Sequence, residues 1–165
     1  LDGDGDFDRL YNYGGRSVTI WDDQGNLVWD SSDQLARLTA AILPNEFNST
    51  NDENDSFDNR SDDKGIEPEG VEVGFFRGRW YAFVGLERVG GIVVFDLTDP
   101  AAPEFVHYLS TRDFGGDAEA GTAGDLGPEG ILYIPRDEER GLWPTLVVTH
   151  EVSGTVTTYR VLFKP

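Results

Sequence analysis

A short motif that occurs twice constrains the fold of this 165-residue chain more than any other feature. Residues 67–70 (EPEG) open the first copy, and residues 127–130 (GPEG) open the second. Further along, residues 86–97 align without gaps on residues 150–161, and both segments alternate as strands do. A repeat of this length that is made of strands indicates the blades of a β-propeller.

Turn residues divide the chain into three blade-like units, at about residues 1–44, 66–112 and 127–165. The middle unit has the outline of a whole blade, with four predicted strands separated by glycine and proline turns. Its strands are predicted at 71–76, 80–86, 92–95 and 104–110. The last unit repeats three of them, from residue 131, at 146–149 and at 155–161. The first unit has predicted strands at 10–15, 17–21 and 27–29, and a helix at 33–43 capped by Asp33.

The number of units predicts an incomplete ring. A propeller has about 4–8 blades of about four strands each, so about three blades indicate the C-terminal part of a larger all-β propeller. The chain starts at Leu1, without an initiator methionine or a signal peptide, which agrees with this interpretation. We expect the remaining blades to come from the same precursor or from another chain.

The net charge of the chain limits the kinds of molecule that it is expected to bind. The chain has 13 Lys and Arg residues against 31 Asp and Glu residues, a net charge of −18. This excess of acid argues against nucleic acid and anionic membranes as partners, and it favours binding of cations or solvation in salty water. The absence of cysteine excludes disulfides and thiolate metal sites. No apolar stretch approaches about 18 residues, so we expect no insertion into a membrane.

Four alternating aspartates at the start of the chain are the best candidates for a metal site: Asp2, Asp4, Asp6 and Asp8. Calcium prefers six to eight hard oxygens, and this spacing lets a turning backbone aim several carboxylates at one point. Tyr13 occupies the place where an EF-hand loop has its glutamate, so the segment is not an EF-hand. The alternative is an acidic turn that is simply solvated.

A long polar segment, the acidic loop at residues 45–65, offers weaker metal candidates. Its side-chain oxygens include those of Asn48, Asp55, Asp58 and Asp62. Alone, such a composition predicts disorder. Within a packed domain, a loop of this length is usually functional or held by something else. The interpretations left open are a cation site, a solvated loop, and a role for Arg60 and Lys64, which could pair with the acids or bind an anion.

Two pairs of glutamates recur with the repeat. Glu69 and Glu129 come where the first strand of each copy begins, and Glu87 and Glu151 follow at the end of a neighbouring strand. First strands line the channel of a propeller, so these carboxylates are predicted to converge on a divalent metal there. The alternative is that each glutamate accepts backbone N–H bonds and fixes a turn.

The two histidines and Ser153 give only weak indications of a zinc site or a catalytic site. His107 and His150 are too few for a zinc site and are not spaced as zinc ligands. His107 is predicted in an outer strand, whereas His150 adjoins Glu151. Ser153 has no histidine base at a recognisable spacing, which argues against a catalytic serine.

Four segments together resemble one family: residues 10–22 (LYNYGGRSVTIWD), 57–70 (FDNRSDDKGIEPEG), 85–91 (GLERVGG) and 151–155 (EVSGT). The chain is similar to the choice-of-anchor I propeller domain, a family that includes mesenchyme-specific cell-surface glycoproteins of biomineralising animals and secreted bacterial proteins. Some bacterial members carry the label alkaline phosphatase. The resemblance implies a β-propeller, an extracellular or cell-surface location and dependence on calcium. No nucleophile or metal-ligand set carries over residue by residue.

Two functions follow from these observations. The first is a calcium-binding, non-catalytic module with a structural or binding role at a cell surface, in a matrix or on a mineral. The alternative is a metal-dependent phosphoesterase, with the four repeated glutamates over the channel and phosphate clamped by three arginines: Arg16, Arg60 and Arg88.

Overall fold

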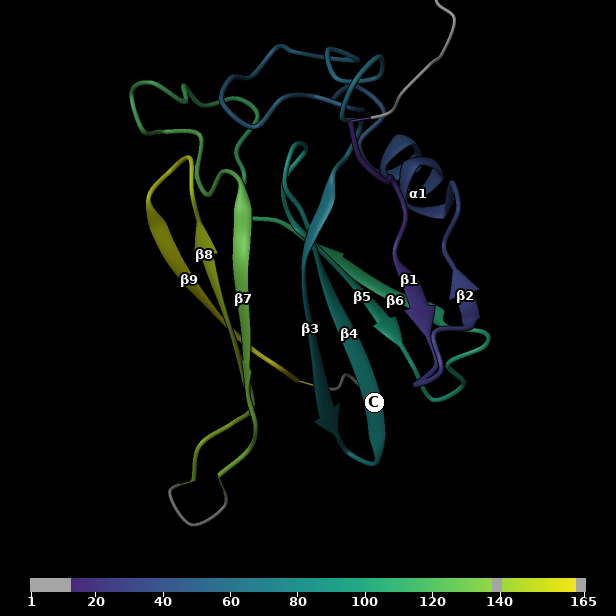
Figure 1. The fold of residues 1–165 in the computed structure, drawn as a ribbon. Coiled ribbons are helices and arrows are strands. Elements are labelled where there is room, and N and C mark those ends of the chain that lie inside the picture. Colours follow the sequence, from purple (N-terminus) through teal and green to yellow (C-terminus); the bar gives the residue numbers. More distant parts are fainter. Residues whose placement is uncertain (1–12, 138–140, 163–165) are drawn as a thin grey trace, which may run out of the picture.

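The fold, seen in a computed structural model that describes residues 13–137 and 141–162, consists of three antiparallel sheets and one short helix (Figure 1). The elements in chain order are β1 (Thr19–Trp21), β2 (Leu27–Asp30), α1 (Gln34–Ile42), β3 (Pro68–Phe76), β4 (Arg79–Leu86), β5 (Ile92–Asp96), β6 (Glu104–Leu109), β7 (Pro128–Ile134), β8 (Thr145–His150) and β9 (Thr155–Arg160). They form the sheets β1-β2, β3-β4-β5-β6 and β7-β8-β9. The prediction of a mostly β chain is therefore confirmed.

The four-stranded sheet lies between the other two sheets and packs on both faces (Figure 1). One core joins this sheet to α1 and the first sheet, and its buried residues include Leu35, Val84 and Phe95. The other core joins it to the third sheet through residues such as Phe83 and Leu146. Burial on both faces explains why the last six residues of β4 are all buried, as its nearly continuous apolar sequence predicts.

The helix forms where the spacing of apolar residues predicts it, but the predicted cap by Asp33 does not form. Leu35 and Thr39 are the buried positions of α1, one helical turn apart. The Asp33 side chain makes no capping hydrogen bond, so that prediction is wrong. The carboxylate instead pairs with Arg37, with Oδ1 3.2 Å from Nη2. Residues 13–15, at the end of a predicted strand, are not in a strand. The helix described here is too short to span a membrane.

The two copies of the repeated motif meet where β3 lies beside β7 (Figure 1). A Cβ atom added to Gly70 would lie 2.4 Å from the backbone oxygen of Glu129, so only glycine permits this approach. Lower along the strands, a Cβ atom on Gly74 would lie 2.6 Å from the ring of Tyr133. Tyr133 also donates its hydroxyl to the carbonyl oxygen of Phe75 at 3.0 Å. The glycine of the motif therefore sets the distance between neighbouring sheets.

We predict that Gly70→Ala destabilises the fold more than the same change at Gly130. The new methyl group at Gly70 meets backbone, which cannot move without separating β3 from β7, and overpacking of this kind costs about 1–3 kcal/mol. At Gly130 the nearest atom is the side-chain oxygen of Thr149, at 2.5 Å, which can rotate away. Urea unfolding of both variants measures the difference. Equal losses of stability would contradict this account of the motif.

Candidate functional site

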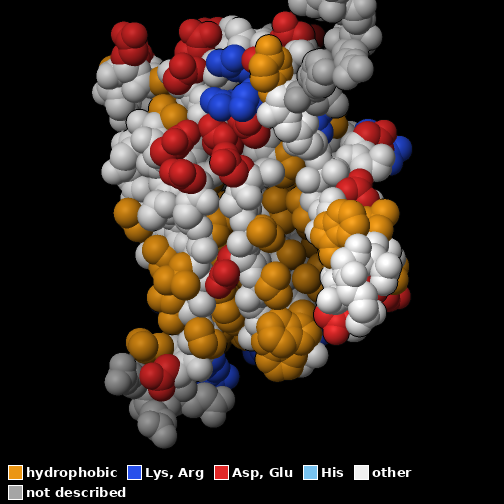
Figure 2. Space-filling model, viewed as in Figure 1, with side chains coloured by type: hydrophobic (Ala, Val, Ile, Leu, Met, Phe, Trp, Pro, Cys, Tyr) orange, Lys and Arg blue, Asp and Glu red, His pale blue; other side chains and the backbone are white. Residues whose placement is uncertain are grey.

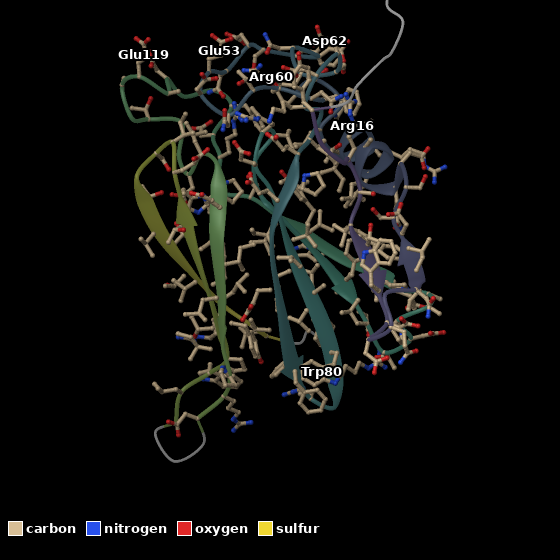
Figure 3. The ribbon with its side chains drawn as sticks, viewed as in Figure 1. Arg16, Glu53, Arg60, Asp62, Trp80 and Glu119 are labelled. Carbon is tan, nitrogen blue, oxygen red and sulfur yellow. The ribbon has the colours of Figure 1, made fainter. Side chains whose placement is uncertain are left out.

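Charged side chains gather at one end of the molecule, which we call the polar end. It consists of the acidic loop (45–65), the β4–β5 turn (87–91) and the β6–β7 loop (110–127). Figure 2 shows Asp and Glu side chains around Lys and Arg at this end, with hydrophobic side chains dominating the rest of the same face. Figure 3 places Arg60 and Glu119 here and Trp80 at the opposite end. The polar end holds most of the described candidate site residues.

A buried arginine holds the acidic loop in place. Arg112 is only 8% exposed and directs its guanidinium at oxygens from two separate segments. Nη1 donates to the backbone oxygens of Thr50 at 2.8 Å and of Arg88 at 3.1 Å. Nη2 donates to the backbone oxygen of Glu53 at 2.8 Å and to Oδ1 of Asn54 at 2.9 Å. The planar guanidinium has several N–H donors in a fixed geometry, so one side chain can hydrogen-bond both the acidic loop and the β4–β5 turn.

The guanidinium of Arg112 is bound by backbone and amide oxygens and lies against an aromatic ring. The guanidinium carbon lies 4.5 Å from the centre of the Phe114 ring. Burial lowers the pKa of Arg112, although Glu46, Tyr108 and Asp52 oppose the shift. The group stays charged, because an arginine keeps its proton in proteins. Loss of these donors would leave several buried carbonyl groups unsatisfied.

The acidic loop itself buries a run of polar residues at 48–51. Asn48 donates Nδ2 to Oγ of Ser61 at 2.7 Å, and the backbone N–H of Thr50 donates to Oγ of Ser56 at 3.2 Å. Burial of four consecutive polar side chains is tolerated because they bond to the loop and to neighbouring segments. The loop is therefore an ordered part of the fold, although its composition alone predicts disorder.

Beneath the loop, Glu87 is the buried centre of a charged network. It is 5% exposed, and its Oε1 accepts a hydrogen bond from Nδ2 of Asn51 at 2.9 Å. Nη2 of Arg88 lies 3.2 Å from the same oxygen. Arg88 also binds Glu67 through Nε, and Nζ of Lys64 lies 2.6 Å from Oε1 of Glu67. The network joins the acidic loop to the start of β3 and the end of β4.

Burial raises the pKa of the Glu87 carboxyl to about 9, with further contributions from hydrogen bonds to Glu69 and Glu67. Burial alone would also raise the pKa of Glu67, but hydrogen bonds from Lys64, Glu87 and Arg88 hold it below its usual value. At neutral pH the proton therefore resides on Glu87, and Glu67 carries the negative charge. Glu87 acts as a neutral hydrogen-bond donor within the fold.

We predict that Glu87→Gln flattens the dependence of stability on pH. The folded-state pKa of Glu87, about 9, lies well above that of a glutamate in an unfolded chain, so the folded protein binds a proton that the unfolded chain releases. The free energy of unfolding should then fall as the pH rises from the pKa of the unfolded chain towards about 9, by at most about 1.4 kcal/mol per pH unit. Glutamine keeps a donor but does not titrate. Urea unfolding between pH 5 and 9 tests this, and parallel curves for the two proteins would contradict it.

We predict that Arg112→Met destabilises the protein by about 3 kcal/mol or more, because each buried carbonyl left unsatisfied costs about 1–3 kcal/mol. Hydrogen exchange should show faster exchange at residues 48–56 under native conditions. The matched control is Arg37→Met, since the Arg37 side chain is 75% exposed and its pair with Asp33 is a surface ion pair. The same loss in both variants would show that Arg112 does not hold the loop.

The repeated glutamates occupy unequal environments. Glu87 is buried under the acidic loop, whereas its counterpart Glu151 is exposed, as are Glu69 and Glu129. Glu69 contributes a hydrogen bond to the Glu87 network. Among the residues that the structure describes, no three His, Asp or Glu side chains are grouped so that they could hold a metal ion. A metal on these glutamates stays a prediction.

The three arginines predicted to clamp phosphate all bind protein oxygens. Nη2 of Arg16 donates to the backbone oxygens of Ser61 at 2.8 Å and of Asp63 at 3.2 Å. Arg60 pairs with Asp63 at 3.3 Å and donates to Oγ1 of Thr50 at 3.1 Å. Arg88 belongs to the Glu87 network. A role in ligand binding stays a prediction for all three.

The calcium candidates lie in different places. Asp2, Asp4, Asp6 and Asp8 are outside the described residues. In the acidic loop, Asp55, Asp58 and Asp62 are exposed, whereas Asn48 is buried with no hydrogen-bond partner for its Oδ1 among the described atoms. Asp55 lines a polar groove of about 420 Å³ between the acidic loop and the β6–β7 loop, together with Asp52, Glu53, Asn54, Gly116, Asp117, Ala118 and Glu119.

A second polar cluster, which the sequence did not indicate, surrounds the partly buried Asp125 and includes the buried His150. Its carboxylate accepts hydrogen bonds from the hydroxyls of Thr111, Thr155 and Thr157, at 2.5–2.6 Å. Nε2 of His150 lies 3.8 Å from Oδ2 of Asp125, and neither ring nitrogen has a hydrogen-bond partner among the described residues. Burial lowers the pKa of His150, although Asp125 opposes the shift. The alternating threonines of β9 were the available signal, because they share a face.

Comparison with known proteins identifies the family. The model of the choice-of-anchor I domain matches residues 1–100. The chain belongs to the choice-of-anchor I family. Gigasin-3a of Magallana gigas is 31% identical over 169 residues, which cover 96% of this chain and 60% of that protein. The mesenchyme-specific cell surface glycoprotein of Strongylocentrotus purpuratus is 26% identical over 172 residues, which cover 96% of this chain and 19% of that protein.

The choice-of-anchor I assignment confirms the resemblance that the sequence motifs indicate. This chain spans less than two thirds of the length of either relative. No solved structure matches the chain.

Proposed function

We propose that this domain is a non-catalytic structural or binding module at a cell surface or in an extracellular matrix. The main support for this proposal is that the cations at the polar end bind oxygens of the protein itself. Arg112 and Arg16 bind backbone oxygens, and Arg88 and Lys64 bind Glu67, so these cations stabilise the fold. The exposed carboxylates on the outer surface are then available to a cell-surface, matrix or mineral partner.

We further propose that the three sheets are neighbouring blades of a β-propeller. Neighbouring blades would pack face to face with their first strands side by side, as β3 and β7 lie (Figure 1). Two exposed apolar faces, one on β3 of the central sheet and one on β7 of the third sheet, support additional blades. Val71, Val73 and Phe75 of β3 are 47–58% exposed, and Leu132 and Ile134 of β7 are 55% and 43% exposed. Apolar patches of this kind mark interaction surfaces, and further blades from the same precursor or another chain would cover them.

Calcium is part of the proposal because of the chemistry of the acidic residues. Hard oxygens suit this ion, and Asp2, Asp4, Asp6 and Asp8 are the preferred ligands. In the polar groove the carboxylates surround a cavity without meeting at one point. Asn48 offers a buried oxygen, Oδ1, without a hydrogen-bond partner among the described atoms. The acidic loop would supply further oxygens from Asp55, Asp58 and Asp62.

We predict that calcium raises the melting temperature of the protein and that chelator reverses the shift. An ion that binds only the folded state stabilises it by about 2.7 kcal/mol at a hundredfold excess over its dissociation constant. Replacing all four N-terminal aspartates with asparagine should abolish most of the shift, and Asp22→Asn with Asp23→Asn is the matched control in an exposed hairpin. An unchanged melting temperature with calcium and with chelator would contradict calcium binding.

The phosphoesterase alternative has one observation in its favour, the raised pKa of buried Glu87, because perturbed carboxyls mark functional sites as well as structural ones. Hydrolysis of p-nitrophenyl phosphate with Ca²⁺, Mg²⁺, Mn²⁺ and Fe³⁺ separates the two functions. We expect no turnover with any metal. Turnover that disappears in folded Glu69→Gln and Glu129→Gln variants would establish the enzyme and overturn the proposal.

A further inference from the structure

The repeat places a histidine where its other copy has a core leucine. Residues 86–97 align on residues 150–161, so His150 at the end of β8 corresponds to Leu86 at the end of β4. Both residues are buried, with exposed fractions of 5% and 0%. Leu86 packs in the core between the first sheet and the four-stranded sheet. An apolar side chain would serve a packing role equally well in both copies, so packing does not explain an imidazole at this position.

The residues around His150 show the same replacement of apolar groups by polar ones. Thr157 of β9 corresponds to Val93, and Ser153 of the β8–β9 turn corresponds to Val89. Both valines are fully buried members of the apolar core. Thr157 instead donates its hydroxyl to Oδ2 of Asp125 at 2.5 Å. The third sheet therefore has a polar cluster where the four-stranded sheet has part of its core.

The ring nitrogens of His150 are unsatisfied within the described part of the chain. Neither Nδ1 nor Nε2 has a hydrogen-bond partner among the described atoms, although the residue is buried. Nε2 lies 3.8 Å from Oδ2 of Asp125, which is too long for a hydrogen bond. A buried polar group without a partner in a native fold calls for an explanation such as a bound water molecule or ion.

The carboxylate that faces this histidine is held in place by hydroxyl groups. Thr111 and Thr157 donate to Oδ2 of Asp125, and Thr155 donates to Oδ1. Although burial alone would raise the pKa of Asp125, these three hydrogen bonds hold it below its usual value. Burial lowers the pKa of His150, so the imidazole is neutral at neutral pH. An ionised carboxylate and a neutral imidazole are the forms that bind a metal ion.

We propose that His150 and Asp125 hold one divalent transition-metal ion, such as Zn²⁺, between Nε2 and Oδ2. Zinc binds imidazole nitrogen and carboxylate oxygen at about 2.0–2.2 Å, so one ion can bridge two such atoms up to about 4.2 Å apart. The observed separation of 3.8 Å lies within this reach. Among the described residues no third His, Asp or Glu is grouped with this pair, so water completes the coordination. The threonine hydroxyls orient the ligating carboxylate, as outer hydrogen bonds do in metal sites.

The imidazole distinguishes this site from the calcium sites proposed above. Imidazole nitrogen suits zinc, copper and nickel, whereas calcium takes hard oxygen ligands. The site also differs from one built on two histidines, which the sequence excludes, because His107 lies in β6 and is not part of the cluster. An ion at this place joins the β6–β7 loop to the β8–β9 hairpin. The inference therefore goes beyond the proposed function and does not depend on calcium binding.

The test is calorimetric titration of the full, untagged 165-residue protein with Zn²⁺, in a buffer whose excess Ca²⁺ occupies sites made only of oxygen. We expect one zinc site and a melting temperature that rises with zinc. His150→Leu, which copies the other repeat, and Asp125→Asn should each weaken zinc binding by at least about tenfold, since loss of even an outer-shell partner has that effect. His107→Leu is the matched control and should leave binding unchanged.

A measurement on the unaltered protein keeps the test decisive if a variant misfolds. Zinc should shift the NMR resonances of the ring nitrogens of His150 and leave those of His107 in place. Zinc binding that survives His150→Leu, or a shift confined to His107, would overturn the proposal. Absence of binding at millimolar zinc would also overturn it and would leave water as the partner of the ring nitrogens.

Discussion

The arrangement of the polar end depends on one buried cation, Arg112. Its donors reach backbone oxygens in the acidic loop and in the β4–β5 turn, which are far apart in the sequence. Once the loop is fixed, Asn51 reaches Glu87 and removes it from water. Burial of Glu87 then makes it a neutral donor to the charged Glu67. The unusual protonation state is thus a consequence of loop placement.

A second constraint, the glycine of the repeated motif, sets the spacing of the sheets. Gly70 lets β3 approach the backbone of Glu129, which belongs to the next copy of the same motif. The glycine of the first copy therefore has a packing role, since it accepts the backbone of the second copy, whereas Gly130 lies against the side chain of Thr149. The glutamate before the glycine is exposed in both copies, and its place beside the polar end follows from the same geometry.

Much of the fold could be predicted from the sequence, and much of the site could not. Alternating residues predicted β3 closely, and short apolar runs predicted β4 and β5, because both patterns are local properties of the sequence. The order of the acidic loop was not predictable from its composition, because Arg112, which holds it, lies outside the loop and in no recognisable motif. The repeat identified Glu87 as a candidate metal ligand, but its neutral state depends on burial by the acidic loop. No such loop buries its counterpart Glu151, which is exposed.

We infer that the charged network at the polar end stabilises the fold, and we propose that any bound metal lies outside this network. A crystal structure of the protein with calcium, with metals located by anomalous scattering, tests this claim most directly. We expect calcium only on the N-terminal aspartates or the exposed acids of the acidic loop, with Glu87 still bonded to Asn51 and Arg88. A metal coordinated by Glu87 together with Glu69, Glu129 or Glu151 would contradict it.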